Sequence, residues 1–97
     1  MYLDTAVERY LVDLVLLTRK PSPYVERGAS PRATLALARL ARAKAFVCAR
    51  DYVVPDDVRA LAKPVFQHRM AFSYQLAADG IEPAEYIGRM IERVQIP

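Results

Sequence analysis

The residues of this chain whose types and spacing could do chemistry stand together in the segment Gly28-Ala29-Ser30-Pro31-Arg32. The segment is typical of a helix start, because the Ser30 hydroxyl can accept free N–H groups of the first turn and Pro31 suits the first helical position. Gly28 would let the incoming chain bend sharply. Arg32 then lies in the first turn, where the helix dipole disfavours a cation unless an anion is nearby. We therefore expect an arginine directed at a phosphate, with an ordinary surface arginine as the alternative.

The other parts needed for ATP hydrolysis are absent from these 97 residues. A P-loop needs a glycine-rich run that ends in Gly-Lys-Ser/Thr, and hydrolysis also needs an acidic residue that holds magnesium. None of the three glycines precedes a lysine, and no apolar strand ends in paired acids. We expect this chain alone not to hydrolyse ATP.

Other residue types that could be reactive have a structural explanation. Asp56 and Asp57 follow Pro55, and negative charge in the first turn of a helix suits its dipole. His68 and Cys48 are the single histidine and the single cysteine, and they lack the spacing of metal ligands. Cys48 stands among apolar residues of a predicted helix, so we expect a buried, unreactive thiol. The sequence predicts neither a metal site nor a catalytic nucleophile.

Three further arginines follow Arg32 along the chain. Arg39, Arg42 and Arg50 come at intervals that place them with Arg32 in one sector of the second predicted helix. They could form an anion-facing strip or a contact for a neighbouring subunit. The alternative is that they are solvated or ion-paired side chains at the border of the core.

The first predicted helix runs from about Thr5 to Arg19. Thr5 and Glu8 have the spacing of a capping box. Val12 and Leu16 lie roughly opposite the main apolar stripe, either as a second contact inside the bundle or as a surface for a neighbouring domain or an adenine ring. The main stripe comprises Val7, Tyr10, Leu11, Leu14, Val15 and Thr18.

The second predicted helix, from about Pro31 to Ala49, follows a connecting loop from Tyr24 to Ala29. Its apolar residues occupy most of the circumference, which is typical of a central helix. The larger of these residues are Leu35, Leu37, Leu40, Phe46 and Val47.

Prolines and periodicity divide the remainder of the chain. Pro55 opens a third helix, which Pro64 should break, leaving a fourth short segment near residues 65–69. Residues 70–75 alternate in polarity as a strand would, and a loop is an equal alternative. Pro83 opens the last helix. Its apolar face comprises Tyr86, Ile87, Met90, Ile91 and Val94.

Length and composition limit the possible folds and cellular compartments. A chain of 97 residues with 54% hydrophobic residues is long enough for one domain and too short for two. We therefore predict a single all-α domain over residues 1–97, a small bundle of four to five helices. One cysteine fits a reducing compartment, and the sequence shows neither a signal peptide nor an apolar run long enough for a membrane. The default expectation is a soluble cytoplasmic domain.

Several separate segments also carry a resemblance. Gly28–Ala33 and the later Arg50-Asp51-Tyr52-Val53, Pro55-Asp56-Asp57-Val58, Leu61-Ala62, Val65 and His68-Arg69 come in the order found in one family. In these segments the chain resembles the C-terminal lid domain of MoxR-type AAA+ ATPases. One departure is Val54, which stands where a Thr or Ser cap is expected and so weakens that helix start.

The resemblance implies a role for the first segment. It makes Arg32 the sensor 2 residue, which contacts the terminal phosphate of the nucleotide, and makes Ser30 and Pro31 its neighbours at the nucleotide. It further implies a longer parent ATPase whose P-loop core holds most of the Mg-ATP. Such a parent would form a homo-oligomeric ring, hexameric in the family, that remodels client proteins, often with a von Willebrand factor A-domain partner.

A stand-alone helical interaction module, binding nucleic acid or a protein partner, is the alternative function. The net charge of +3 is small, and the basic residues form no block of five or six. Exposed aromatic residues are also not interleaved with them. These features argue against nucleic acid as the partner.

Overall fold

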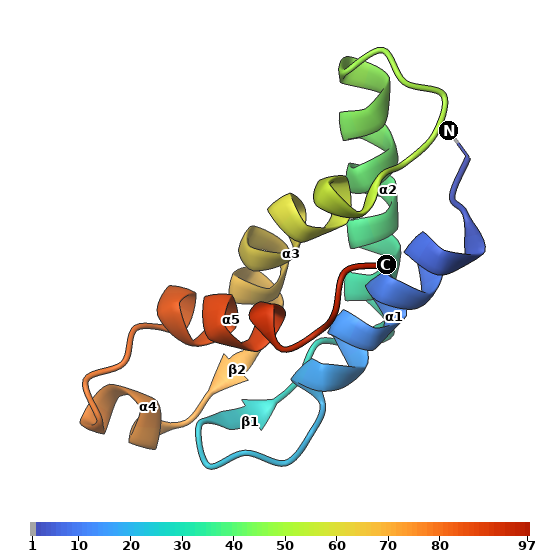
Figure 1. Cartoon of the computed structure of the whole chain (residues 1–97). Coiled ribbons are helices and arrows are strands. Elements are labelled where there is room, and N and C mark those ends of the chain that lie inside the picture. Colours follow the sequence, from blue (N-terminus) through green and yellow to red (C-terminus); the bar gives the residue numbers. More distant parts are fainter. Residues whose placement is uncertain (1) are drawn as a thin grey trace.

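Five helices and a two-stranded ribbon make up residues 2–97, the part of the chain that this computed structural model describes (Figure 1). The all-α class predicted from the sequence is confirmed. The elements in chain order are α1 (Thr5–Thr18), β1 (Val25–Arg27), α2 (Pro31–Val47), α3 (Pro55–Arg69), β2 (Ala71–Phe72), α4 (Tyr74–Ala78) and α5 (Pro83–Glu92).

Helix α1 buries the predicted stripe of six residues. The helix starts differently from the prediction, because Asp4 is the N-cap and its backbone carbonyl accepts the N–H of Glu8 at 2.8 Å. Thr5 is therefore the first helical residue, and the predicted Thr5–Glu8 capping box is wrong. Val12 and Leu16 are 37% and 50% exposed, so they are not a second contact inside this bundle.

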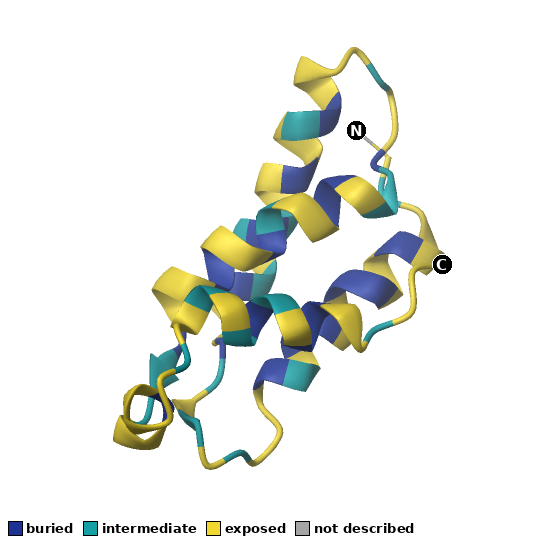
Figure 2. Cartoon of the chain, turned by 60° about the vertical axis from the view of Figure 1, so that its left-hand side comes forward, coloured by how far each residue is buried: buried dark blue, intermediate teal, exposed yellow. Residues whose placement is uncertain are grey.

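Helix α3, rather than α2, occupies the centre of the bundle, because it packs against α1, α2 and α5 and its contacts with α2 and α5 are the most extensive between helices (Figure 1). The buried face of α2 is built from Ala33, Leu37, Ala41 and Ala45. Small alanines at a spacing of four residues let the neighbouring helices approach closely. The larger apolar residues of α2 other than Leu37 remain exposed, and Figure 2 shows exposed surface along much of the helix.

Pro64 does not break α3, which is continuous from Pro55 to Arg69. Proline removes one backbone hydrogen bond and crowds the carbonyl of the preceding turn. Pro64 lies on the exposed side, whereas Ala62, Val65 and Phe66 are buried. Packing against three helices therefore holds α3 together through the defect, and the predicted break is wrong.

The segment predicted as a loop from Tyr24 to Ala29 contains β1, which pairs antiparallel with β2. Val25 faces Phe72 in this register, and the Ser73 N–H donates to the Tyr24 carbonyl at 2.9 Å. The alternating segment 70–75 is thus a strand for two residues and then the start of α4, a helix that the sequence did not predict. The rings of Tyr24 and Phe72 both contact Tyr86 edge-on.

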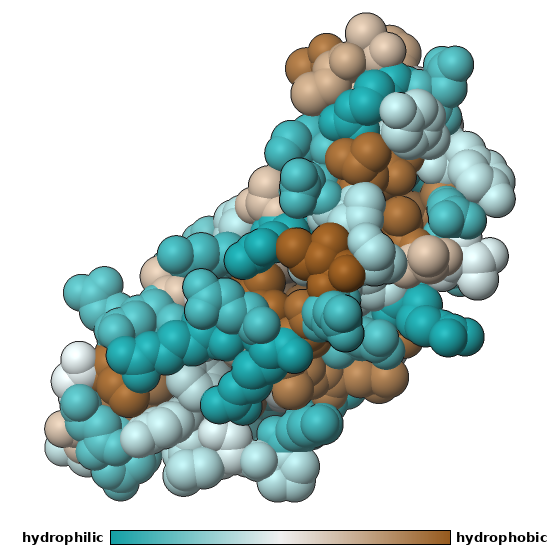
Figure 3. All heavy atoms as spheres, viewed as in Figure 1, coloured by the Kyte–Doolittle hydropathy of each residue, from teal (hydrophilic) through white to brown (hydrophobic). Residues whose placement is uncertain are grey.

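Helix α2 ends at Val47, two residues earlier than predicted, in a left-handed turn at Ala49 with φ 58°. The Arg50 N–H donates to the Ala45 carbonyl and the Ala49 N–H to that of Phe46, at 2.9 and 3.0 Å. These two bonds define a Schellman motif. The end of α2 projects from the bundle (Figure 1), and apolar side chains gather there in Figure 3.

Cys48 lies at this projecting end and is exposed, so the predicted buried thiol is wrong. Its neighbours Phe46 and Val47 are 70% and 82% exposed. Within residues 2–97 no group of three or more His, Cys, Asp or Glu side chains could hold a metal ion. No helix in the same range is long and apolar enough to cross a bilayer.

Candidate anion-binding site

The loop that leads to Arg32 is clamped to the end of α1. The Thr18 hydroxyl accepts the Ala29 N–H at 3.0 Å and donates to the Val15 carbonyl at 2.6 Å, and Thr18 is 1% exposed. The Arg19 Nε donates to the Ala29 carbonyl at 2.8 Å. Two hydrogen bonds, one to the last residue of α1 and one from its C-cap residue, therefore fix the chain at Ala29, three residues before Arg32.

Gly28 is required here for close approach rather than for a sharp bend. A Cβ at this position would lie 2.4 Å from the Thr18 carbonyl oxygen and 2.9 Å from the Arg19 Cα. No other residue type leaves room for the backbone of Gly28 against the end of α1. The predicted sharp bend at Gly28 is thus replaced by close packing against the end of α1, which positions the start of α2.

Helix α2 begins as the sequence predicts, with Ser30 at the N-cap and Pro31 as the first helical residue. The side chain of Ser30 makes no capping hydrogen bond, and its backbone carbonyl accepts the Ala33 N–H at 2.9 Å. The predicted hydroxyl cap is therefore wrong. Because the Ser30 side chain is exposed and without a partner among residues 2–97, it remains available at the helix start.

Arg32 lies in the first turn of α2, and its side chain borders a surface pocket of about 300 Å³. The same pocket is lined by Arg39 on α2 and by Arg69 in the last residue of α3, with Leu35 and Ala36 as its apolar part. No acidic side chain lines it. Three guanidinium groups therefore surround one hollow at the surface.

None of these three guanidinium groups makes an ion pair or a side-chain hydrogen bond within the described residues 2–97. Arg42, which the sequence placed in the same sector, does not line the pocket. The first turn of α2 also contains no acidic residue that would offset the charge of Arg32. The local field at this end of α2 is suited to an anion.

Arg50 does not belong to this group, because it lies beyond the end of α2 and pairs with Asp57. Its two terminal nitrogens donate to the two carboxylate oxygens, both at 2.7 Å. The hydrogen bonds from Arg50, together with one from the Val54 N–H at 2.9 Å, hold the pKa of the Asp57 carboxyl below its usual value although burial opposes this shift. The ion-paired alternative is confirmed for Arg50.

Asp57 therefore replaces the cap that Val54 lacks. The N–H of Val54, the N-cap of α3, is bound by the Asp57 side chain three residues later, which is half of a capping box. Asp56, in the same turn, is exposed and makes no such bond. The prediction that these two carboxylates serve the start of a helix is confirmed for Asp57.

An apolar hollow of about 360 Å³ adjoins the arginine pocket and shares Ala36 and Arg69 with it. Its other lining residues are Leu40 on α2 and four residues of α3, namely Leu61, Pro64, Val65 and His68. The single histidine thus lies at the rim of an apolar surface. No local sequence pattern predicts that His68 lies beside this surface, because its position there depends on how α2 packs against α3.

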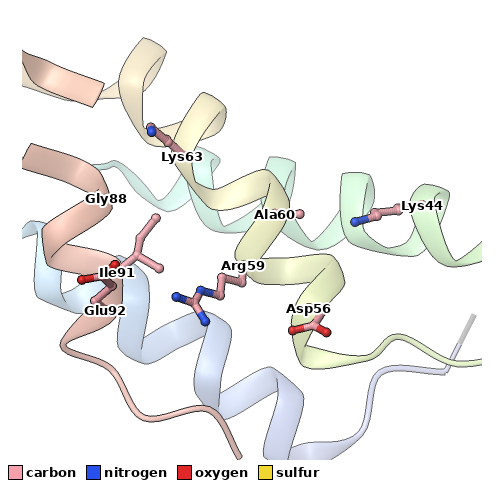
Figure 4. A pocket seen from close by; sticks show the side chains of 8 residues that line it. All are labelled: Lys44, Asp56, Arg59, Ala60, Lys63, Gly88, Ile91 and Glu92. Carbon is pink, nitrogen blue, oxygen red and sulfur yellow. The ribbon is translucent and has the colours of Figure 1, made fainter. Parts of the chain in front are cut away.

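A larger groove of about 490 Å³ lies on another face, between α3 and α5 (Figure 4). It carries charges of both signs, since Lys44, Arg59 and Lys63 line it together with Asp56 and Glu92. Acidic and basic side chains are mixed around this groove, so it offers no uniform field for an anion. The arginine pocket is therefore the better candidate for a phosphate.

Comparison with known proteins identifies the family of this chain. The family model of the AAA lid domain matches residues 19–88. The chain is 38% identical to Chaperone MoxR1 of Mycobacterium tuberculosis and 32% identical to Protein MoxR of Methylorubrum extorquens, over 99% and 97% of its length. It spans only 28% and 31% of those two proteins.

A solved structure gives the same result for the fold. The crystal structure of a putative ATPase from Cytophaga hutchinsonii superposes with a TM-score of 0.91 at 34% identity. The superposition covers 98% of this chain and 31% of that protein. The matched region of the family model begins at Arg19, so it includes the Arg19 half of the clamp, the residues of the arginine pocket and the Arg50–Asp57 pair, and leaves out Thr18. This chain belongs to the AAA lid domain family, as a lid of the MoxR-type AAA+ ATPases.

Proposed function

We propose that residues 1–97 are one lid domain of a longer MoxR-like ATPase and supply Arg32 to ATP as its sensor 2 residue. The observation that supports the proposal is the placement of Arg32, which is exposed, unpaired and fixed at a helix start by the clamp to α1. A guanidinium remains protonated at any physiological pH and presents a planar fork of donors to phosphate oxygens. Ser30 and Pro31 are proposed as its neighbours at the nucleotide.

The chemistry is divided between this lid and a P-loop core. The core would hold Mg-ATP through its backbone amides and a metal-binding acid, neither of which this chain supplies. Arg32 would place positive charge against the γ-phosphate, where negative charge develops as the phosphoryl group is transferred. The acid-free arginine pocket suits that task, because no carboxylate competes for Arg32.

The same arrangement would couple the state of the nucleotide to movement of the lid. The hydrogen bonds of Ala29 to Thr18 and from Arg19 tie the segment before Arg32 to the end of α1, and α1 packs against α2, α3 and α5. A contact made by Arg32 with a γ-phosphate would therefore be transmitted to the bundle as a unit, and its loss after hydrolysis would release the lid.

The assembly around the lid follows from the same proposal. We propose a ring of identical ATPases, hexameric as in the family, that acts in the cytoplasm as a chaperone-like remodelling machine, with a von Willebrand factor A-domain protein as a possible partner. The relative named Chaperone MoxR1 supports the chaperone part of this proposal. The exposed Val12 and Leu16 on α1 are proposed as part of the contact with a neighbouring domain.

A domain exchange tests this function. The chain would replace its matching region in the Cytophaga hutchinsonii protein, and ATP turnover of this chimera would be compared with that of the unaltered protein and of the same protein without its lid. We expect the purified 97-residue chain to hydrolyse no ATP and the chimera to recover turnover well above the lid-less form. Robust hydrolysis by the pure chain, or a folded chimera no more active than the lid-less protein, would contradict the proposal.

A further inference from the structure

We propose that Arg39 and Arg69 act together with Arg32 as a three-arginine cradle for the phosphate chain of the nucleotide. This inference rests on the proposed function and extends it, because neither Arg39 nor Arg69 has an assigned role. The cradle would bind the β- and γ-phosphates together rather than the γ-phosphate alone.

The spacing of the arginines favours a ligand with several phosphates. Arg32 and Arg39 are seven residues apart, so they lie on the same face of α2 about 10 Å from each other along the axis. Arg69 reaches the same pocket from the end of α3. A chain of two or three phosphates can span side chains whose attachment points lie this far apart, so that each guanidinium binds its own oxygens.

The charges around the pocket point to the same class of ligand. Helix α2 carries four basic side chains and no acidic one, as its sequence PRATLALARLARAKAFV shows. Within residues 2–97 only Arg50 and Arg89 have carboxylate partners, at 2.7 and 2.6 Å, so the gathering of three unpaired arginines, rather than the lack of a partner, distinguishes this pocket. Three unpaired guanidinium groups around an acid-free hollow repel one another, and a polyanion removes that repulsion while each fork binds its oxygens.

The position of Arg69 adds a reason for its role. It is the last residue of α3, where the helix dipole stabilises a cation, so its charge is held in place without an acidic neighbour. The mixed-charge groove between α3 and α5 has three basic residues as well, but Asp56 and Glu92 lie among them. Among the five described pockets, the pocket of Arg32, Arg39 and Arg69 is the one lined by three Lys or Arg residues and no acid, whereas the other acid-free pocket with more than one of them has two, Lys20 and Arg93.

The pure 97-residue chain allows a direct test with tripolyphosphate as the probe. The side-chain N–H signals of its arginines would be followed by NMR as tripolyphosphate or orthophosphate is added. We expect tripolyphosphate to shift the signals of Arg32, Arg39 and Arg69 and to bind more tightly than orthophosphate. Each of the variants Arg39→Gln and Arg69→Gln should weaken binding by about 3- to 10-fold.

Two matched variants serve as controls. Arg42→Gln lies on the same helix outside the pocket, and Arg59→Gln lies in the mixed-charge groove. Both should bind tripolyphosphate as the unaltered chain does. Equal losses in all four variants, or a single-stranded oligonucleotide that binds as tightly as tripolyphosphate, would show a general attraction for polyanions and overturn the cradle.

The chimera separates this inference from the proposed function. There, Arg39→Gln and Arg69→Gln should raise the KM for ATP by a similar factor, while Arg42→Gln leaves it unchanged. An unchanged KM and unchanged tripolyphosphate binding, beside a loss of turnover in Arg32→Ala, would overturn the cradle and leave the role of Arg32 standing. Unchanged turnover in Arg32→Ala would overturn the proposed function itself.

Discussion

At the scale of single residues, the Asp57 carboxylate joins two segments that the sequence leaves separate. It accepts both terminal nitrogens of Arg50, beyond the end of α2, and the N–H of Val54 at the start of α3. Asp57 is 1% exposed, and the Arg50 side chain is 24% exposed. The pair therefore fixes the angle at which the chain turns from α2 into α3.

Asp57→Asn should lower the free energy of unfolding at neutral pH by about 2–3 kcal/mol, because it leaves Arg50 without its charged partner. The pKa of Asp57 in the folded protein lies below its ordinary value of 3.8. The stability that its charge contributes is therefore present above that value and is lost as the pH falls through the lower, folded pKa.

The difference in stability between Asp57→Asn and the unaltered chain should accordingly shrink as the pH falls below about 4. Urea unfolding at a series of pH values measures this difference. Asp56→Asn, an exposed carboxylate in the same turn, should change stability by less than about 0.5 kcal/mol. A difference for Asp57→Asn that stays constant down to about pH 2 would contradict the role of the charge.

At Tyr10, in contrast, we expect a substitution that does not lower the free energy of unfolding. It is 2% exposed, its hydroxyl has no hydrogen-bond partner within residues 2–97, and burial raises its pKa. Tyr10→Phe removes an unsatisfied buried group, so it should keep or raise the free energy of unfolding, by up to about 1 kcal/mol. Tyr74→Phe, at an 85% exposed residue, is the neutral control. A clear loss of stability in Tyr10→Phe would indicate a hydrogen bond to this hydroxyl.

At the scale of the elements, the junction between α1 and α2 depends on Gly28. Gly28→Ala would place a Cβ 2.4 Å from the Thr18 carbonyl oxygen and should destabilise the fold by about 1–3 kcal/mol. Gly88→Ala, inside α5, meets nothing closer than the Lys63 Nζ at 4.0 Å and should stabilise the helix by up to about 1 kcal/mol. Melting temperatures of the two variants measure the contrast, and a shift of the same sign in both would refute the packing role of Gly28.

The left-handed turn at the end of α2 offers a second test at the scale of the elements. Ala49 holds a left-handed conformation with φ 58°, which glycine adopts without strain. Ala49→Gly should raise stability by about 1 kcal/mol, or about 4–8 °C in melting temperature. Ala43→Gly, at an exposed position inside the same helix, should lower stability by a similar amount. If both variants lose stability, the Schellman motif at Ala49 does not form.

How well the elements could be predicted depended on whether their signals are local. The buried stripe of α1 follows from periodicity alone, so the sequence predicted all six residues. The ribbon of β1 and β2 joins segments about 45 residues apart, and no local pattern specifies such a pairing. Pro64 signals a break within its own turn, but the packing of α3 against its neighbours outweighs that local preference.

At the scale of the whole molecule, the candidate site was predicted only in part. The capped segment and the resemblance identified Ser30, Pro31 and Arg32, and their role at a nucleotide stays a prediction. Arg69 was part of the resemblance without a function, since its meeting with Arg32 depends on the packing of α3 against α2. The exposure of the larger apolar residues of α2 could not be read from their number, because it depends on which helices cover them.

Residues 2–97 form a folded bundle with a cluster of three arginines that lack ion-pair partners among these residues, and the sequence contains no P-loop motif. In the proposed function, Arg32 acts on a nucleotide that another domain holds. ATP turnover by the chimera with Arg32→Ala tests this claim most directly, with Arg42→Ala as the control. We predict a loss of roughly 100-fold or more for Arg32→Ala, with the melting temperature of the isolated lid almost unchanged and with normal turnover in the control. Turnover equal to that of the unaltered chimera would remove Arg32 from the mechanism.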